Sequence, residues 1–90
     1  GPLAAFAAIA VEYPRTEYAA KSLYQMAMIQ LRQYYDLDQA KQLLEKVLAE
    51  PAATPSLHTD VRLRMGEIAV ARADTVRAAE AFASVAATPW

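Results

Sequence analysis

Apolar residues recur along this chain at intervals of three and four, which is the spacing of one face of an α-helix. The stripe is clearest over residues 37–50, and residues 17–35, 56–73 and 75–87 carry similar stripes. An alanine-rich apolar run over residues 3–12 precedes them. No segment shows the strict alternation of apolar and polar residues that a half-buried strand requires. The pattern therefore predicts an all-α protein of about five helices.

Helix-breaking and helix-capping residues separate the first three stripes. Pro14 is followed by Thr16, which can cap a helix that opens with the acidic Glu17. Asp36 precedes the next stripe, and Gln39 stands three residues later, at the spacing of a capping box. These residues predict that Pro14 lies between two helices and not inside one.

The last two breaks have the same character. Pro51 and Pro55 bracket the third break, where Thr54 or Ser56 can cap the next helix and Pro55 suits a first helical turn. Asp74 is predicted to open the last helix.

The chain overlays itself when it is shifted by 38 residues, which indicates a repeat protein. An apolar pair with the spacing F-x-x-I/V recurs in this register, at Phe6 and Ile9, Leu44 and Val47, and Phe82 and Val85. Met28 falls on Gly66 in the same register. A glycine in mid-helix costs roughly 1 kcal/mol against alanine, so we expect a close helix contact at Gly66 to compensate.

The register predicts one domain over residues 1–90 that is built from repeats. The second helix of a partial repeat occupies residues 3–14, and full repeats occupy residues 17–52 and 55–90. Prolines 14, 51 and 89 close the three units. Each helix pair has apolar faces that it cannot cover alone, so neighbouring pairs are expected to stack into a solenoid.

The second unit reads R-L-R-M-G-E-I-A and then D-T-V-R-A-A-E-A-F-A-S-V-A, and with these residues the chain resembles a tetratricopeptide repeat (TPR) protein. The family keeps a small residue, an alanine, an aromatic and a small apolar residue at four places, here Gly66, Ala78, Phe82 and Val85. The resemblance implies an α-solenoid of antiparallel helix hairpins in a right-handed superhelical array. The chain departs from the family in its period, 38 instead of about 34, and in its first unit, where Met28 and Leu44 replace the glycine and the aromatic.

The resemblance also implies a function. In TPR proteins the first helices of the pairs line a concave groove that binds peptides or partner domains. We therefore expect a non-catalytic scaffold that binds a partner protein or peptide. The candidate groove residues lie off the core stripes of their helices; they are Ser22, Gln25, Ile29, Arg32, Gln33, Asp60, Leu63, Glu67, Val70 and Ala71. The competing interpretation is that these residues widen the core stripe or face open water.

Two other functions stay open. The first helix lacks a hairpin partner, so Leu3, Phe6 and Ile9 are expected to present an apolar surface through which copies of the chain associate. The chain is alternatively an accessory domain of a larger enzyme. Gly1-Pro2 resembles the pair left by tag cleavage, which favours an excerpt from a longer protein. The string Y-P-R-T-E-Y-A is similar to repeats in bacterial cell-envelope proteins of this type, so a bacterial periplasmic or cell-envelope location is the expectation.

Composition and charge exclude several classes of partner. The chain has 90 residues, of which 56% are hydrophobic and 21% charged, as in a small folded domain. Its net charge is −1 and its charges are mixed, which argues against nucleic acid and against a polybasic membrane contact. No apolar run reaches the roughly 18–20 residues of a membrane helix. The chain has no cysteine, so disulfide and thiol chemistry are excluded.

Candidate catalytic chemistry is sparse. His58 is the single histidine, and it is expected to be a solvated surface residue. One histidine without cysteine makes no zinc site, and no glycine-rich loop is present to hold phosphate. We therefore expect no catalytic residue, no cofactor and no metal. The five tyrosines, at positions 13, 18, 24, 34 and 35, suit either an aromatic peptide-binding surface or, as the favoured interpretation, packing between helices with hydroxyls that reach water.

Overall fold

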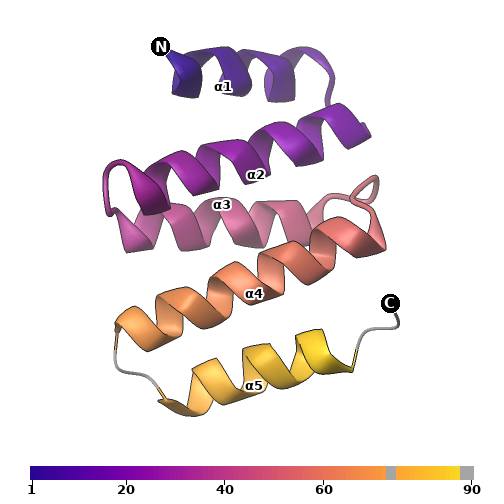
Figure 1. Cartoon of the computed structure of the whole chain (residues 1–90). Helices are drawn as coiled ribbons and strands as arrows, with labels where there is room; N and C mark the ends of the chain where they lie inside the picture. Colours follow the sequence, from indigo (N-terminus) through magenta and orange to yellow (C-terminus); the bar gives the residue numbers. More distant parts are fainter. Residues whose placement is uncertain (73–74, 88–90) are drawn as a thin grey trace. The chain divides into compact units, whose positions relative to one another are not determined.

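The computed structural model describes residues 1–72 and 75–87, and in these residues it contains helices and no strand (Figure 1). The helices are α1 (Pro2–Glu12), α2 (Glu17–Arg32), α3 (Leu37–Ala49), α4 (Pro55–Ala71) and α5 (Thr75–Ala86). The predicted all-α class is confirmed. Asp74, predicted to open the last helix, and Pro89, predicted to close the last unit, lie outside the described residues.

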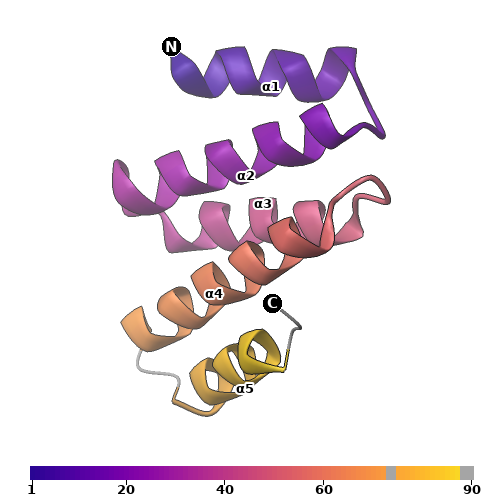
Figure 2. The ribbon, with the colours of Figure 1, turned by 45° about the vertical axis from the view of Figure 1, so that its right-hand side comes forward.

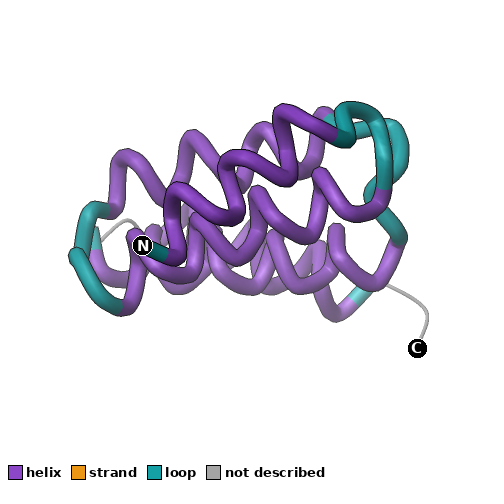
Figure 3. Tube along the Cα trace, turned by 90° about the horizontal axis from the view of Figure 1, so that it is seen from above, coloured by secondary structure: helices purple, strands orange, loops and turns teal. Residues whose placement is uncertain are grey.

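The chain forms two compact units, residues 1–54 and 55–90. The boundary falls in the break predicted between the two full repeats. In the first unit α2 packs on both α1 and α3, and in the second unit α4 packs on α5. Within each unit, helices that follow one another in the chain run antiparallel (Figures 1 and 2). Seen from above, the connections before and after α2 lie at opposite ends of that helix (Figure 3).

The core of the first unit combines small residues of α2 with large residues of α3. On α2 the buried residues include Ala20 and Ala27. On α3, Leu44 and Val47 are almost fully buried, at 1% and 0% exposure. Small side chains on one helix let a neighbouring helix approach closely, and burying a Leu or Val side chain contributes roughly 1.5–3 kcal/mol. The predicted apolar stripe of α3 is therefore the face that it buries.

The second unit depends on a close contact between Gly66 of α4 and Phe82 of α5. A Cβ added at Gly66 would lie 2.6 Å from Cε1 of Phe82, well inside van der Waals contact. Only a glycine lets the aromatic ring lie this close to the backbone of α4. The predicted close contact at this glycine is confirmed, and it accounts for a residue that otherwise weakens a helix.

Helix α2 ends at Arg32, so the predicted end at residue 35 is wrong by three residues. The backbone N–H groups of Gln33 and Tyr34 both donate to the carbonyl oxygen of Ile29, at 2.9 and 3.3 Å. The second of these bonds spans five residues, so the regular spacing of four ends here. Tyr35 then adopts a φ of 54°, in the left-handed region. This conformation costs an L-residue roughly 1–2 kcal/mol. It turns the chain so that α3 can begin two residues later.

Two of the predicted caps are confirmed by their hydrogen bonds. Thr16 Oγ1 accepts from the N–H of Ala19 at 3.2 Å, and Asp36 Oδ1 accepts from the N–H of Gln39 at 3.0 Å. A cap of this kind stabilises a helix by about 0.5–2 kcal/mol. Pro14 lies in the connection between α1 and α2, as predicted.

At the start of α4, the predicted place of Pro55 is confirmed and one of the two predicted caps is not. The helix begins at Pro55, which occupies the first turn as expected. Of the two predicted caps, Ser56 therefore lies inside the helix, and Thr54 is the residue directly before it. Thr59 Oγ1 donates to the carbonyl oxygen of Pro55 at 3.1 Å, which gives a buried hydroxyl a partner.

Candidate functional site

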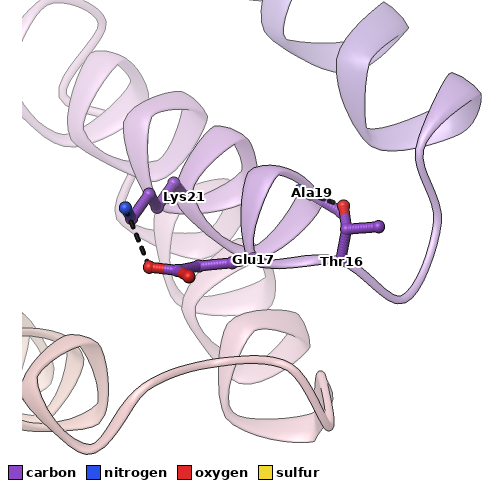
Figure 4. Close-up of polar contacts among 4 residues, drawn as sticks. All are labelled: Thr16, Glu17, Ala19 and Lys21. Atoms are coloured by element: carbon purple, nitrogen blue, oxygen red, sulfur yellow. Dashed lines mark hydrogen bonds and ion pairs between the residues drawn. The ribbon is translucent and has the colours of Figure 1, made fainter.

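The solvent-facing side of α2 starts from a well-defined helix beginning. Thr16 holds the first turn through the N–H of Ala19, and one turn later Lys21 Nζ lies 2.9 Å from Glu17 Oε1 (Figure 4). The pKa of Lys21 is raised, because Glu17 accepts a hydrogen bond from the ammonium and adds an opposite charge. Both side chains are largely exposed. This end of the helix therefore presents a fixed pair of opposite charges to water.

Four of the five candidate groove residues on α2 and its C-terminal end are accessible. Gln25, Arg32 and Gln33 are exposed, and Ile29 is half-buried. Positions 25, 29 and 32 are four and three residues apart, so they follow one side of the helix. This side joins an amide, an aliphatic and a guanidinium group, which suits contact with another polypeptide.

Ser22 does not belong to this surface. Its exposed fraction is 5%, so its predicted place in a groove is wrong. A small side chain at this position is enclosed by neighbouring groups even though the helical spacing places it near Ile29. Helical spacing alone cannot show this, because the outcome depends on how far the neighbouring structure extends over the helix.

Tyr18 belongs to the same side of α2 and was missed among the groove candidates. It is 70% exposed and stands seven residues before Gln25, which puts the two side chains two turns apart on one side. The spacing of seven was the available signal.

The expectation that the tyrosines pack between helices is wrong for four of the five. Tyr13, Tyr18, Tyr34 and Tyr35 are all at least half exposed, and Tyr24 is half-buried. Three of the four stand in the connections at the two ends of α2, outside the helices themselves. The first unit therefore carries most of the exposed aromatic surface among the described residues.

The candidate residues on α4 share one side of that helix. Asp60, Val70 and Ala71 are exposed, and Leu63 and Glu67 are half-buried. Buried residues such as Val61 and Ile68 lie on the other side. All five predicted positions are therefore at least partly accessible, and the apolar Leu63 and Val70 follow one another at a spacing of seven.

An ion pair modifies this side of α4. Arg64 Nη1 donates to Glu67 Oε1, one turn further along the helix, and both side chains are about three-quarters covered. Glu67 is thus partly neutralised. The accessible strip that remains between Asp60 and Val70 is less acidic than the sequence suggests.

His58 differs from its prediction as a solvated residue. It is half-buried in the first turns of α4, and its Nε2 atom is enclosed with no hydrogen-bond partner. Over the residues that the structure describes, no group of three or more His, Cys, Asp and Glu side chains is arranged to hold a metal ion. In the same residues, no helix has both the length and the apolar character needed to cross a membrane.

No protein-family model, no curated protein and no solved structure matches the chain.

Proposed function

We propose that this chain is a segment of a TPR-like α-solenoid and acts as a scaffold that binds another protein or peptide. The 38-residue register and the antiparallel helix pairs of the two units support this assignment. The first helix of each pair, α2 and α4, offers the binding side, as in the groove of the family that the sequence resembles.

The observation that carries the proposal is the composition of the accessible side of α2. Tyr18, Gln25 and Arg32 are exposed there beside the half-buried Ile29. Tyrosine and arginine are enriched among the residues that dominate binding energy at protein interfaces, since each combines a large contact area with directional hydrogen bonds. The helical backbone below them is capped and ordered, so these anchors lose little further freedom on binding.

The accessible side of α4 is a second proposed binding side, with a different composition. Val70 and Leu63 supply apolar area, and Asp60 supplies a charge at one end. Each side is proposed to bind by itself: a polypeptide on α2 would meet amide and cationic groups, and one on α4 would meet aliphatic and acidic groups. The proposed ligand of the α2 side is therefore a peptide that carries at least one apolar anchor for the strip around Ile29.

Selection from a displayed library of random peptides against the 90-residue chain tests this proposal. Selected peptides should bind with micromolar Kd, and the amide chemical-shift changes that they cause in the chain should map to the exposed side of α2 or to that of α4. Tyr18→Ala and Arg32→Ala should each weaken binding by about tenfold, the value of one lost anchor contact.

Glu45→Ala and Lys46→Ala provide the matched controls, because both residues are exposed on α3, away from the proposed side. These variants should bind selected peptides as the unchanged chain does. Peptides whose shifts map to α3, or whose affinity is insensitive to Tyr18 and Arg32, would show that the binding side has been assigned wrongly.

A further inference from the structure

Both connections that flank α2 place a residue other than glycine in the left-handed region of backbone conformation. Arg15, between α1 and α2, has a φ of 59°, and Tyr35, between α2 and α3, has a φ of 54°. This conformation is unfavourable for L-residues, and glycine normally occupies it. Strained residues of this kind concentrate at functional sites. Of the two, Arg15 carries a charged side chain, so it has the chemistry to select a ligand.

The connection that contains Arg15 is held by hydrogen bonds on both sides. Thr16 Oγ1 accepts from the N–H of Ala19 at 3.2 Å and donates to the carbonyl oxygen of Tyr13 at 2.5 Å. The N–H of Tyr13 donates in turn to the carbonyl oxygen of Ile9 at 2.9 Å. The backbone of Arg15 is therefore fixed before any partner arrives, which lowers the entropy lost on binding.

Arg15 carries a positive charge that no other side chain takes up. It is exposed, and within the described residues its guanidinium has no hydrogen bond or ion pair, with Glu12 or with any other group. The neighbouring cation Lys21 is already paired with Glu17 at 2.9 Å. A guanidinium is a planar fork of N–H donors that matches the two oxygens of a carboxylate. The complementary group on a partner is therefore a carboxylate.

Two exposed tyrosines stand close to Arg15 in the chain. Tyr13 is two residues before it and 50% exposed, and Tyr18 is three residues after it and 70% exposed. Tyr18 also belongs to the accessible side of α2 that includes Gln25 and Ile29. Arg15 therefore stands where the proposed binding side of α2 begins.

We propose that Arg15 selects an acidic residue in the polypeptide that binds the α2 side. This inference rests on the proposed function and deepens it, because it names the group at one end of the bound peptide. Thr16, next to Arg15, and Ile29 stand 13 positions apart, which is about 20 Å along a helix. An extended peptide covers this length with about six residues. The acidic residue should therefore lie about six residues from the apolar anchor.

The other end of α2 has the wrong charge for the same ligand. The connection with Tyr35 lies at the opposite end of the helix (Figure 3), and Asp36 and Asp38 follow there, both exposed. Arg32, the cation at that end, already has an interaction partner. A carboxylate of a partner is repelled by two others nearby. Tyr35 is therefore not part of the proposed site, although its backbone conformation resembles that of Arg15.

Parallel peptide selections against the 90-residue chain and its Arg15→Gly variant test the inference. Glycine relieves the left-handed conformation, so a loss of binding cannot be attributed to a strained fold. Peptides that map to α2 of the unchanged chain should carry Asp or Glu about six residues from their apolar anchor. Peptides selected on the variant should lack this preference. Replacing the acid of a selected peptide by its amide should weaken binding about tenfold to the unchanged chain, and should not weaken binding to the variant.

Tyr35→Gly is the matched control, because it makes the same backbone change at the other end of α2. It should keep both the affinity and the acidic preference. Peptides that bind α2 without an acidic residue overturn the role of Arg15 and leave the proposed binding side intact. An Arg15→Gly variant that keeps the preference, or a Tyr35→Gly variant that loses it, does the same. Selections that yield no peptide on α2 overturn the inference together with the α2 side itself.

Discussion

The two units pack their paired helices with different side chains at equivalent positions. At equivalent positions of the 38-residue register, the first unit has Met28 and Leu44 and the second has Gly66 and Phe82. Leu44 is 1% exposed, whereas Phe82 is 37% exposed and lies against the backbone of α4. A repeat position therefore prescribes a contact between helices, and the residue sizes on the two helices decide how close and how enclosed that contact is.

The largest expected effect is on stability, and it should differ between the two units because Leu44 is more deeply buried than Phe82. Leu44→Ala removes a fully enclosed side chain and should lower the free energy of unfolding by about 2–5 kcal/mol. Phe82→Ala should cost less than Leu44→Ala, because more than a third of its surface is already in water. Urea unfolding of both variants checks the order, and equal losses would show that the two positions are energetically equivalent.

The second prediction concerns Gly66. Gly66→Ala improves helix propensity by roughly 1 kcal/mol, but its Cβ would displace the Phe82 ring, and overpacking typically costs about 1–3 kcal/mol. We expect a net loss of stability. In the double variant Gly66→Ala, Phe82→Leu the smaller side chain makes room for the Cβ, so the loss from the first substitution should disappear. A double-mutant cycle by thermal unfolding measures this coupling, and strictly additive effects would contradict the contact.

A smaller effect is expected at the end of α2, in the first unit. Tyr35→Gly relieves a left-handed conformation that costs an L-residue roughly 1–2 kcal/mol, although glycine gives back part of the gain through its greater freedom when unfolded. A net increase of several tenths of a kcal/mol is expected in urea unfolding. Tyr35→Ala is the control, since alanine keeps the conformational cost, and it should not stabilise the chain.

The smallest effect concerns the exposed pair Glu17–Lys21. The folded state raises the pKa of Lys21, so the pair stabilises the protein at neutral pH, where the lysine is charged in both the folded and unfolded states. This contribution is lost as the pH rises through the raised pKa in strongly alkaline solution. Glu17→Gln should therefore reduce the alkaline change in melting temperature only slightly. A large change at neutral pH would contradict the exposure of the pair.

Much of the fold was predictable because it follows from local rules. The spacing of three and four indicated the helices, and Thr16 and Asp36 cap where their short polar side chains suggested. The end of α2 was not predictable, since Tyr34 and Tyr35 continue an apolar pattern while tertiary structure requires a turn. The missing signal was glycine, which would normally mark a left-handed residue.

The candidate site was less predictable than the fold. The five positions on α4 are accessible as expected. Ser22 is not, and Tyr18 is far more exposed than the favoured interpretation allowed. Burial of a side chain near the edge of a helical stripe depends on how far the neighbouring helices cover it. The spacing of residues along one helix does not show the extent of that cover.

The sequence by itself determined the helical class and the beginnings of α2 and α3, because these depend on residues within one or two turns of each other. The 38-residue register is also legible in the sequence, because it is a recurrence of residue types and needs no knowledge of distances. Tertiary structure alone decided the exposure of residues at the edges of the apolar stripes, and hence that four of the five tyrosines are exposed. It also decided that Gly66 is needed to admit the Phe82 ring. These outcomes depend on distances between helices, and such distances are set by the packed volumes of side chains far apart in the chain.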